Sequence, residues 1–323
     1  MSLPIIHLGV RKWDHLLPMA LGEVRSEKYD VRLHRLPKTP DLRERRDLDG
    51  GETSLSRITL DRQAGRTDLV PIPAFVLSAF RHRCILVNQA SELTRLDQLA
   101  GARIGLTGWP DTGNTWTRAL VRAAGVSLDE ITWVVGGLTP EPQPAARIGP
   151  YGSPANVSVV SPESSIVRML AAGELDAIMT PTMPAGFHDV DSSMRTLLPD
   201  YRAQEVAYFR DKGFVPAIHT ITLRRSILEQ YPDAAADVLD LFRRSHRLWM
   251  DQRIELVDTT PWLIDEVQAL SGSLGLDWSP YHPGYLRTML GELSDELFHQ
   301  GITGKRPDPD ATFATYFSIS VEG

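Results

Sequence analysis

Four polar stretches of this 323-residue chain carry side chains that could do acid–base chemistry or bind an anion. In the first, Gly-Gly-Glu-Thr-Ser at residues 50–54, Glu52 and Ser54 stand where a helix is expected to begin. Small residues ahead of a helix expose backbone N–H groups that attract anions, and Glu52 could act as an acid or a base. A Ser/Thr helix cap with a surface glutamate is the alternative interpretation.

The second and third stretches carry groups suited to holding a carboxylate. Arg81 and His82 stand just before an apolar run, where arginine could bind a carboxylate through two N–H groups and histidine could move protons near neutral pH. Further on, Thr112 and Asn114 open an expected helix and could hold a carboxylate or a phenolate, while Trp116 could stack on a ring. The alternatives are a solvated basic turn for the second stretch and a helix cap with a core tryptophan for the third.

The fourth stretch is a histidine within an apolar strand pattern, Ile-His-Thr-Ile at residues 218–221. A lone histidine in such a run is more often a core residue with satisfied hydrogen bonds, so His219 gains a functional interpretation only from its neighbours. His-Asp-Val-Asp at residues 188–191 is a weak metal-site pattern that we interpret as a polar loop, so no metal site is predicted. The chain lacks the H-E-x-x-H, C-x-x-C, G-x-S-x-G and phosphate-loop motifs.

Chain length and net charge limit the classes of protein to which this sequence can belong. The chain has more residues than one hydrophobic core usually organises, which favours two domains. The net charge of −7, from 34 Lys and Arg against 41 Asp and Glu, argues against a general nucleic-acid binder. It leaves room for a small anionic ligand, since a cleft can be locally basic on an acidic protein. No apolar stretch approaches the roughly 18 residues that a membrane-spanning helix needs.

The single cysteine and the first strand bear on the compartment. Cys84 cannot form an internal disulfide and falls in an apolar run, so we expect a buried strand residue in a reducing environment. Residues 5–10 have a strand pattern instead of the basic leader and long apolar run of a signal peptide. Together these features predict a cytoplasmic protein. A homo-oligomer stays open, with the C-terminal helices as a dimer surface.

Strand and helix patterns alternate along much of the chain, which predicts mostly parallel sheets with helices on their faces. Domain crossings are expected near residues 87–88 and 205–206, which makes the first domain discontinuous (1–88 and 206–323) and the second continuous (89–205). Polar groups beyond the strand ends would then surround one cleft. Expected strands are 5–10, 29–36, 69–72, 84–88, 103–106, 131–135, 175–179 and 218–223; expected helices are 14–24, 42–48, 53–65, 112–124, 161–172, 234–256, 261–274 and 284–299, with a long loop at 138–160.

A succession of short motifs resembles the 4,5-dihydroxyphthalate decarboxylase family over residues 5 to 260. The more specific motifs are Glu-Thr-Ser-Leu-Ser at 52–56, Phe-Arg-His at 80–82 and His-Thr at 219–220, whereas Gly-Glu-Leu-Asp-Ala at 173–177 is common to many solute-binding proteins. One region departs from the family, because residues 110–115 read Pro-Asp-Thr-Gly-Asn-Thr in place of a Tyr-Gln-Met-Thr-Ala-like stretch, and only Thr112 aligns. Further matching stretches are 72–75, 99–105, 116–118 and 133–137.

The resemblance implies an α/β protein of the type II periplasmic-binding-protein fold, with two α/β domains, a central cleft and C-terminal helices. It implies a decarboxylase of a hydroxylated aromatic carboxylate, acting in aromatic catabolism without a cofactor on a small anionic ligand. By position, the side chains facing the cleft would be Glu52, Ser54, Arg81, His82, Trp116 and His219.

Such a reaction needs a base for the ring hydroxyl, an acid for the ring carbon and a cation for any carboxylate that stays on the ring. His82 or His219 suits the first two roles and Arg81 the third, while Glu52 could orient a histidine or donate the proton. We therefore expect His219→Ala and Arg81→Ala each to lose most turnover while the fold persists.

Two other functions fit the same fold. A solute-binding protein that feeds an ABC transporter needs an anion seat but no proton donor. An enzyme of another class, such as one acting on pyrimidine or menaquinone precursors, is the third alternative, and its motifs match this chain less well.

Overall fold

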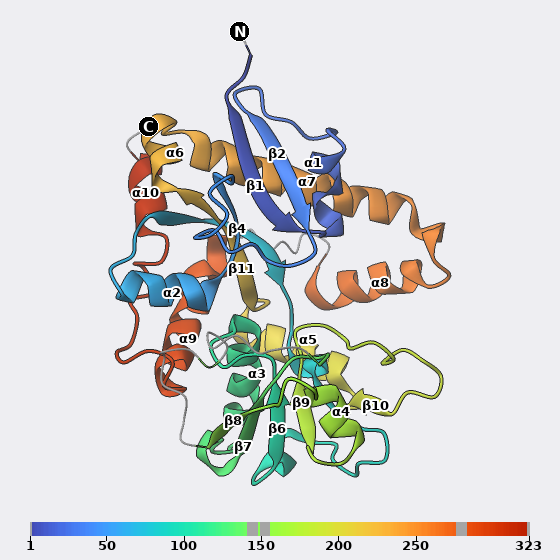
Figure 1. Cartoon of the computed structure of the whole chain (residues 1–323). Coiled ribbons are helices and arrows are strands. Elements are labelled where there is room, and N and C mark those ends of the chain that lie inside the picture. Colours follow the sequence, from blue (N-terminus) through green and yellow to red (C-terminus); the bar gives the residue numbers. More distant parts are fainter. Residues whose placement is uncertain (1, 141–147, 149–155, 276–282, 322–323) are drawn as a thin grey trace. The chain divides into compact units, whose positions relative to one another are not determined.

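The chain folds into two compact α/β units, each with its own sheet (Figure 1). The computed structural model describes residues 2–140, 148, 156–275 and 283–321. Both units combine segments that are far apart in the sequence. Unit 1 comprises Met1–Ser78, Ala217–Arg287 and Pro309–Gly323, and unit 2 comprises Ala79–Pro216 and Thr288–Asp308.

Unit 1 is built on a five-stranded sheet in the order β2-β1-β3-β11-β4. β1 runs parallel to β2 and β3, whereas β11, which comes late in the chain, is antiparallel to β3 and β4. The carboxyl ends of β1 and β3 and the amino end of β11 therefore meet at the same edge of the sheet. The strands are β1 (Ile5–Arg11), β2 (Asp30–Leu36), β3 (Gly50–Ser54), β4 (Leu69–Ser78) and β11 (Ala217–Arg224).

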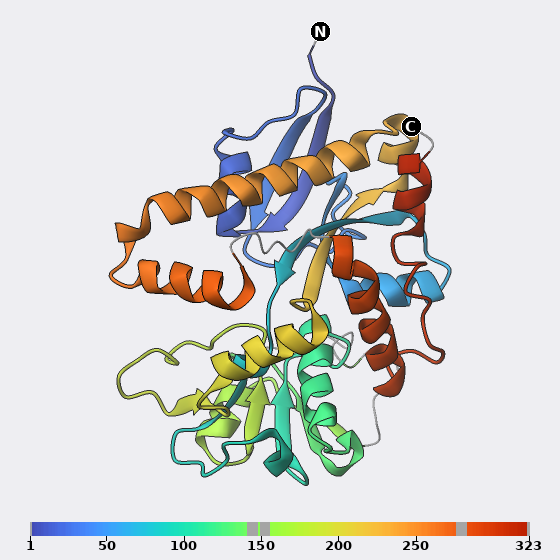
Figure 2. The ribbon, with the colours of Figure 1, turned by 180° about the vertical axis from the view of Figure 1, so that it is seen from behind.

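One face of this sheet is covered by the long helix α7 (Ala234–Glu255), which crosses it in Figures 1 and 2. Val238 and Phe242 of α7 are fully buried in one cluster with Leu8 of β1 and Ile221 of β11. Full burial of each such side chain contributes about 1.5–3 kcal/mol. The helix thus fixes the strands that carry the polar groups at the sheet edge.

Two glycines at the start of β3 let its neighbours come very close. A Cβ atom on Gly50 would lie 2.3 Å from the backbone oxygen of Thr222 in β11, and one on Gly51 would lie 2.3 Å from that of Gly9 in β1. The predicted helix here starts too early, because a strand comes first and α2 (Leu55–Gln63) begins only after it. Residues 50–54 therefore pair with neighbouring strands and do not form the predicted anion-binding site of exposed N–H groups.

Gly50→Ala is expected to destabilise unit 1 by about 1–3 kcal/mol, because the added methyl group meets backbone that the sheet holds in place. Gly272→Ala is the matched control: it lies within α8 (Leu263–Leu274) with no described atom within 4 Å of its Cβ position. Alanine there should stabilise the helix by about 0.5–1 kcal/mol. Urea unfolding followed by circular dichroism measures both, and a Gly50→Ala protein of unchanged stability contradicts the close strand approach.

β4 is longer than the sequence predicts. The sequence predicts a strand over residues 69–72 only, because Pro71 and Pro73 argue against a longer one, yet β4 continues through both to Ser78. Proline lacks the N–H that a central strand must donate, but it is tolerated on an edge strand. β4 occupies that position, since β11 is its one partner within the described part of the sheet.

Unit 2 is built on a six-stranded sheet in the order β10-β5-β9-β6-β7-β8. Val134 of β7 packs with the helix α4 (Ile166–Ala171) on one face, while the neighbouring Trp133 points to the other face and meets Trp109. Cys84 is buried, as predicted, but it ends a short 3-10 turn just before β5 and does not belong to the strand. The strands are β5 (Ile85–Asn88), β6 (Arg103–Leu106), β7 (Thr132–Val135), β8 (Val157–Val159), β9 (Ala177–Met179) and β10 (Met194–Thr196).

The chain passes between the units at places other than those predicted. The expected crossing near residues 87–88 falls inside β5, which pairs with both β9 and β10. The expected crossing near residues 205–206 falls inside α5 (Tyr201–Lys212) of unit 2. The chain leaves unit 1 after Ser78 and returns after Pro216.

A C-terminal segment that was expected in the first domain belongs to unit 2. It includes most of α9 (Leu286–His299), which polar contacts join to α3 (Thr112–Ala123). The fully buried Arg118 of α3 donates from Nε to Oε1 of Gln300 at 2.7 Å. One turn further along the same helix, Arg122 forms an ion pair of 2.7 Å with Glu296. A buried guanidinium requires such acceptors, so these contacts hold the segment in unit 2.

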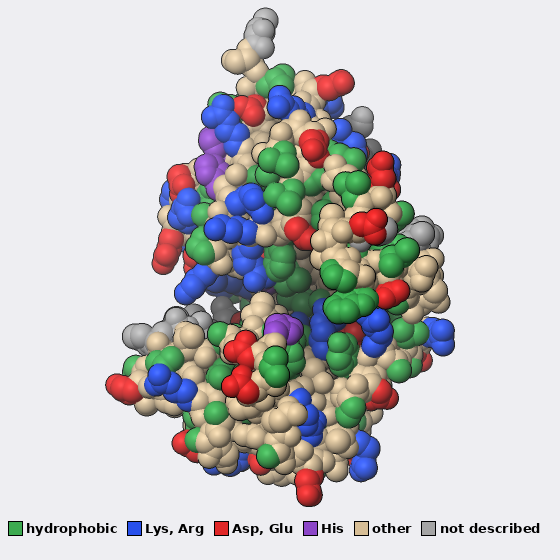
Figure 3. Space-filling view, turned by 90° about the vertical axis from the view of Figure 1, so that its right-hand side faces the viewer, with side chains coloured by type: hydrophobic (Ala, Val, Ile, Leu, Met, Phe, Trp, Pro, Cys, Tyr) green, Lys and Arg blue, Asp and Glu red, His purple; other side chains and the backbone are tan. Residues whose placement is uncertain are grey.

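The other helices are α1 (Leu17–Ala20), α6 (Arg225–Gln230) and α10 (Ala314–Val321). Most of the loop predicted at residues 138–160 lies outside the described residues, although residues 157–159 form β8. None of the helices in the described ranges is long and apolar enough to cross a bilayer. Charged side chains of both signs are spread over the face drawn in Figure 3.

Candidate functional site

The candidate site of unit 1 lies at the sheet edge where β1 and β3 end and β11 begins. Glu52 is opposite Ile221 in the pairing of β3 with β11, and Ser54 is opposite His219. Paired residues and their neighbours two positions along share one face of a sheet. Glu52, Ser54 and His219, which were predicted as site residues, therefore come together on the face covered by α7.

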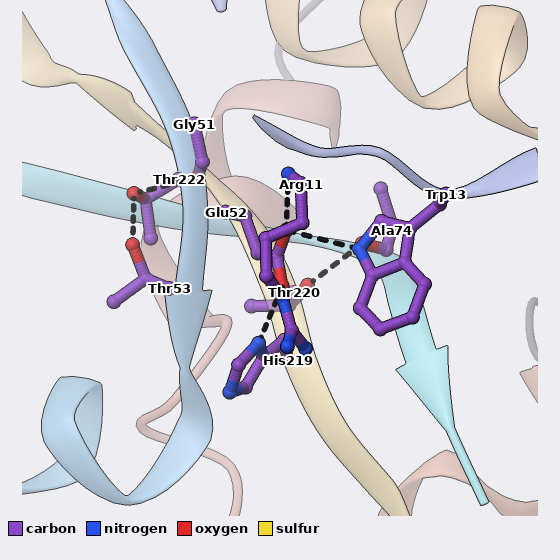
Figure 4. Close-up of polar contacts among 9 residues, drawn as sticks. All are labelled: Arg11, Trp13, Gly51, Glu52, Thr53, Ala74, His219, Thr220 and Thr222. Carbon is purple, nitrogen blue, oxygen red and sulfur yellow. Dashed lines mark hydrogen bonds and ion pairs between the residues drawn. The ribbon is translucent and has the colours of Figure 1, made fainter. Parts of the chain in front are cut away.

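The Glu52 carboxylate is the centre of this group (Figure 4). Its Oε1 atom accepts a hydrogen bond of 2.5 Å from His219 Nδ1 and one of 3.0 Å from Arg11 Nε. Its Oε2 atom accepts one of 2.8 Å from the backbone N–H of Arg11 and one of 3.0 Å from Trp13 Nε1. Four donors thus hold both oxygens, and the carboxylate fixes three side chains at once.

The charge state of Glu52 follows from these contacts. The side chain is 0% exposed, and burial by itself raises the pKa of a carboxyl group. The hydrogen bond from His219 and the charges of His219 and Arg11 outweigh burial and bring the pKa of Glu52 from 4.5 down to about 2. Glu52 is therefore ionised at neutral pH, which leaves it the orienting role and removes the predicted role of proton donor.

His219 has one ring nitrogen in use and one available. Because Glu52 is ionised, Nδ1 must carry the proton of their shared hydrogen bond. Nε2 takes part in no hydrogen bond within the described part of the chain, and the side chain is 15% exposed. An imidazole held in this way can accept or donate a proton at Nε2, as the histidine of a carboxylate–histidine pair does.

Arg11 and Trp13 were not predicted as site residues. Arg11 is the last residue of β1, and its Cζ atom lies 4.2 Å from the centre of the Trp13 ring. The signal that could have found them is their place at the carboxyl end of a buried parallel strand, where ligand-binding groups gather in α/β proteins. Only the fold brings residues 11, 52 and 219 together.

Neutral aromatic side chains extend the group beyond Trp13. The His15 ring stacks on Trp13 with 6.3 Å between centroids and meets the edges of His246 and Trp249. Burial lowers the pKa of both His15 and His246 to about 4, so both are uncharged at neutral pH. Arg11 and His219 are thus the groups bonded to Glu52 that can offer positive charge.

Polar side chains also hold the strands together on the opposite face. The hydroxyl groups of Thr53 and Thr222 lie 3.0 Å apart across β3 and β11, and Thr220 donates to the backbone oxygen of Ala74 at 3.2 Å (Figure 4). These contacts fix the register that places His219 beside Glu52.

Arg81 of unit 2 is buried beneath the first turn of α3. It donates from Nη2 to the backbone oxygen of Thr180 at 2.6 Å and from Nε to Oγ1 of Thr117 at 3.3 Å. A Cβ atom on Gly113 would lie 3.4 Å from its Cζ atom, so glycine makes room for the guanidinium. The side chain is 3% exposed, and burial lowers its pKa. These internal contacts favour a role in holding α3 in place over the predicted binding of a ligand carboxylate.

The three predicted site residues of α3 are also buried. Asn114 Nδ2 donates to Oγ1 of Thr107 at 3.1 Å and to the backbone oxygen of Gly108 at 3.0 Å, which closes the turn before the helix. Trp116 is 2% exposed and meets the ring of Phe214, and Thr112 is 1% exposed. The interpretation as a helix start with Trp116 in the core therefore fits better than that of a ligand-binding loop.

His82 is buried in unit 2 as well. It is 5% exposed, its ring meets the edge of Tyr208, and Nδ1 has no hydrogen-bond partner within the described ranges. Burial, helped by the charge of Arg83, lowers its pKa to about 4. His82 is therefore neutral at pH 7 and poorly suited to donate a proton there.

His82→Phe is expected to make unit 2 more stable in mild acid. A histidine with a lowered folded-state pKa contributes its full stability above pH 6.5 and loses it as the pH falls to about 4, because the unfolded chain takes up the proton first. The loss reaches about 3 kcal/mol at about 1.4 kcal/mol for each pKa unit. Denaturant unfolding at pH 7.5 and 5 measures it, and the phenylalanine variant should lose less stability between the two. An equal loss in both proteins contradicts the buried, neutral state of His82.

Comparisons with solved structures establish the fold. The chain is 17% identical to the alkanesulfonate-binding protein SsuA of Xanthomonas axonopodis pv. citri bound to MOPS, with a TM-score of 0.57 over 97% of this chain and 99% of that one. It is 15% identical to the periplasmic aliphatic sulphonate binding protein SsuA of Escherichia coli, with a TM-score of 0.59 over 96% and 97%. The predicted periplasmic-binding-protein fold is therefore confirmed.

Comparisons with curated sequences address the family. No family model matches the chain. It is 27% identical over 322 residues to a 4,5-dihydroxyphthalate decarboxylase of Comamonas testosteroni, which spans 97% of both chains. It is 30% identical over 190 residues to a 4,5-dihydroxyphthalate decarboxylase of Pseudomonas putida, which spans 56% of this chain and 72% of the relative. The chain belongs to the 4,5-dihydroxyphthalate decarboxylase family.

Proposed function

We propose that this protein decarboxylates a hydroxylated aromatic dicarboxylate of the 4,5-dihydroxyphthalate type, as a step in the breakdown of aromatic acids. The observation that carries the proposal is the His219 imidazole, fixed through Nδ1 by the ionised Glu52 and with Nε2 unbonded in the described structure. The relatives named as decarboxylases support the choice of reaction.

The chemistry requires one proton for each carboxylate lost. Ionisation of the hydroxyl para to the leaving carboxylate pushes electron density into the ring, and the carbon that bears the carboxylate then takes a proton. The carbon–carbon bond breaks, its electrons restore the aromatic ring, and CO2 leaves. Once the phenolate has regained its proton, the products are CO2 and a ring with hydrogen at the vacated carbon.

His219 is the residue that we assign to protonation of the ring carbon. A proton on Nε2 makes the imidazole cationic, and the Glu52 carboxylate 2.5 Å from Nδ1 stabilises that cation. After transfer the imidazole is neutral and can take a proton from solvent through its exposed edge. Glu52 acts through His219 and is a positioning residue in this proposal.

A solute-binding protein is the second candidate, because the fold neighbours are named as sulfonate-binding proteins. Such a protein needs anion binding but no proton transfer. A bound aromatic acid that is recovered unchanged distinguishes this candidate from a decarboxylase.

The test is to incubate purified protein with 4,5-dihydroxyphthalate, 4-hydroxyphthalate, phthalate and 3,4-dihydroxybenzoate, and to measure CO2 release and binding for each. The proposal predicts CO2 from 4,5-dihydroxyphthalate and none from phthalate, which lacks the hydroxyl that pushes electrons into the ring. Binding of the whole panel without CO2 supports the second candidate instead.

A further inference from the structure

The terminal nitrogens of Arg11 are available next to the proton-transfer group. An arginine side chain has five N–H donors, and that of Arg11 donates only its Nε–H to Glu52. Neither Nη1 nor Nη2 takes part in a hydrogen bond in the described part of the structure, and the side chain is 21% exposed. We propose that Arg11 binds the carboxylate that the substrate keeps, and so sets the preference of the His219 site for rings that carry one.

The position of the guanidinium is fixed before any ligand arrives. Glu52 holds Nε at 3.0 Å, and the Trp13 ring lies 4.2 Å from Cζ. Trp13 is itself fixed, because its Nε1 donates to the same carboxylate. A guanidinium that is already ordered loses little side-chain freedom on binding, and its fork of N–H groups matches the two oxygens of a carboxylate.

Arg11 and His219 also share one acceptor. Arg11 Nε and His219 Nδ1 both bind Oε1 of Glu52, and the unbonded nitrogens lie two bonds further along each side chain. One carboxylate oxygen therefore positions both the group that binds the retained carboxylate and the group that delivers the proton.

The charges around Arg11 allow this role. Glu52 balances one positive charge, while His15 and His246 behind Trp13 are neutral. Asp14 lies beside His15 but is largely exposed and is 3.9 Å from Arg253. Protonated His219 and Arg11 together then outweigh Glu52 and favour an anion.

The inference rests on the proposed function, but its test requires no turnover. Isothermal titration calorimetry compares 3,4-dihydroxybenzoate, which has the retained carboxylate, with catechol, which lacks it. The unmodified protein should bind the benzoate at least tenfold more tightly. Arg11→Gln should reduce this preference roughly 10- to 100-fold, because a charge-assisted bond is lost, and Arg11→Lys should reduce it less.

Arg32→Gln is the matched control, since Arg32 is an exposed arginine of β2 that pairs with Asp30. It should keep the preference of the unmodified protein. A preference that persists in Arg11→Gln overturns the inference, and so does unmodified protein that binds neither compound or both equally. Absence of CO2 release together with an Arg11-dependent preference overturns the proposed reaction and leaves the carboxylate site standing.

Discussion

Replacing His219 with asparagine lowers kcat for decarboxylation by about 10²–10⁴-fold in this account, the range that general acid–base groups contribute. Asparagine can still donate a hydrogen bond to Glu52, so the sheet edge should keep its structure while the proton donor is lost. Substrate affinity should fall much less than kcat, because Arg11 is retained. Initial rates of CO2 release over a range of 4,5-dihydroxyphthalate concentrations separate kcat from KM.

The matched control is His188→Asn, which changes an exposed histidine of unit 2 in the same way. It should leave both kinetic constants as they are. If His219→Asn retains turnover within a few-fold of the unmodified protein, another group donates the proton and the assignment is wrong.

Glu52→Gln carries the second large expected effect, on stability as well as on rate. The carboxylate has a folded-state pKa of about 2 against 4.5 in an ordinary glutamate, so its contribution to stability is complete above pH 4.5 and is lost as the pH falls toward 2. The difference corresponds to about 3 kcal/mol. Removing it also leaves Arg11 partly buried without its counter-charge, so we expect a loss of about 3–5 kcal/mol at pH 7.

Denaturant unfolding at pH 7, 5 and 3.5 measures this effect. The stability gap between unmodified protein and Glu52→Gln should be largest at pH 7 and should shrink at pH 3.5. Glu174→Gln, which changes an exposed glutamate of unit 2, should have nearly the stability of the unmodified protein at each pH. The kcat of Glu52→Gln should fall as well, since the imidazolium loses its stabilising charge. A gap that is small at pH 7, or that widens in acid, contradicts an ionised Glu52.

The sequence predicted the fold class better than it predicted the limits of single elements. Alternating strand and helix patterns follow from burial on each face of a sheet, so the two-sheet α/β architecture was readable. The strand that became β4 was predicted to end at residue 72, because prolines argue against a central strand. Its position at the edge of the sheet follows from its pairing with β11, which comes from far along the chain. The glycines at 50 and 51 were predicted to precede a helix, and their place in a strand could not be foreseen for the same reason: Thr222, the strand partner that Gly50 approaches, is remote in sequence.

The candidate site shows the same limit. Glu52 and His219 were predicted separately, and it is the pairing of β3 with β11 that joins them. The position of Arg11 and Trp13 at the end of a buried strand was a weak signal, since basic and aromatic residues after a strand are common at protein surfaces. In contrast, Asn114 and Trp116 have the pattern of a polar helix start. A turn that binds a ligand and a turn whose side chains bond to its own backbone oxygens share this pattern, so the sequence alone does not distinguish them.

The central claim is tested most directly by incubating the unmodified protein with 4,5-dihydroxyphthalate in D2O and identifying the product by NMR. A proton delivered from an exchangeable imidazole to the ring carbon predicts one CO2 for each 3,4-dihydroxybenzoate, with one deuterium at the carbon that lost its carboxylate. Recovery of unchanged 4,5-dihydroxyphthalate under conditions where it binds would contradict the account.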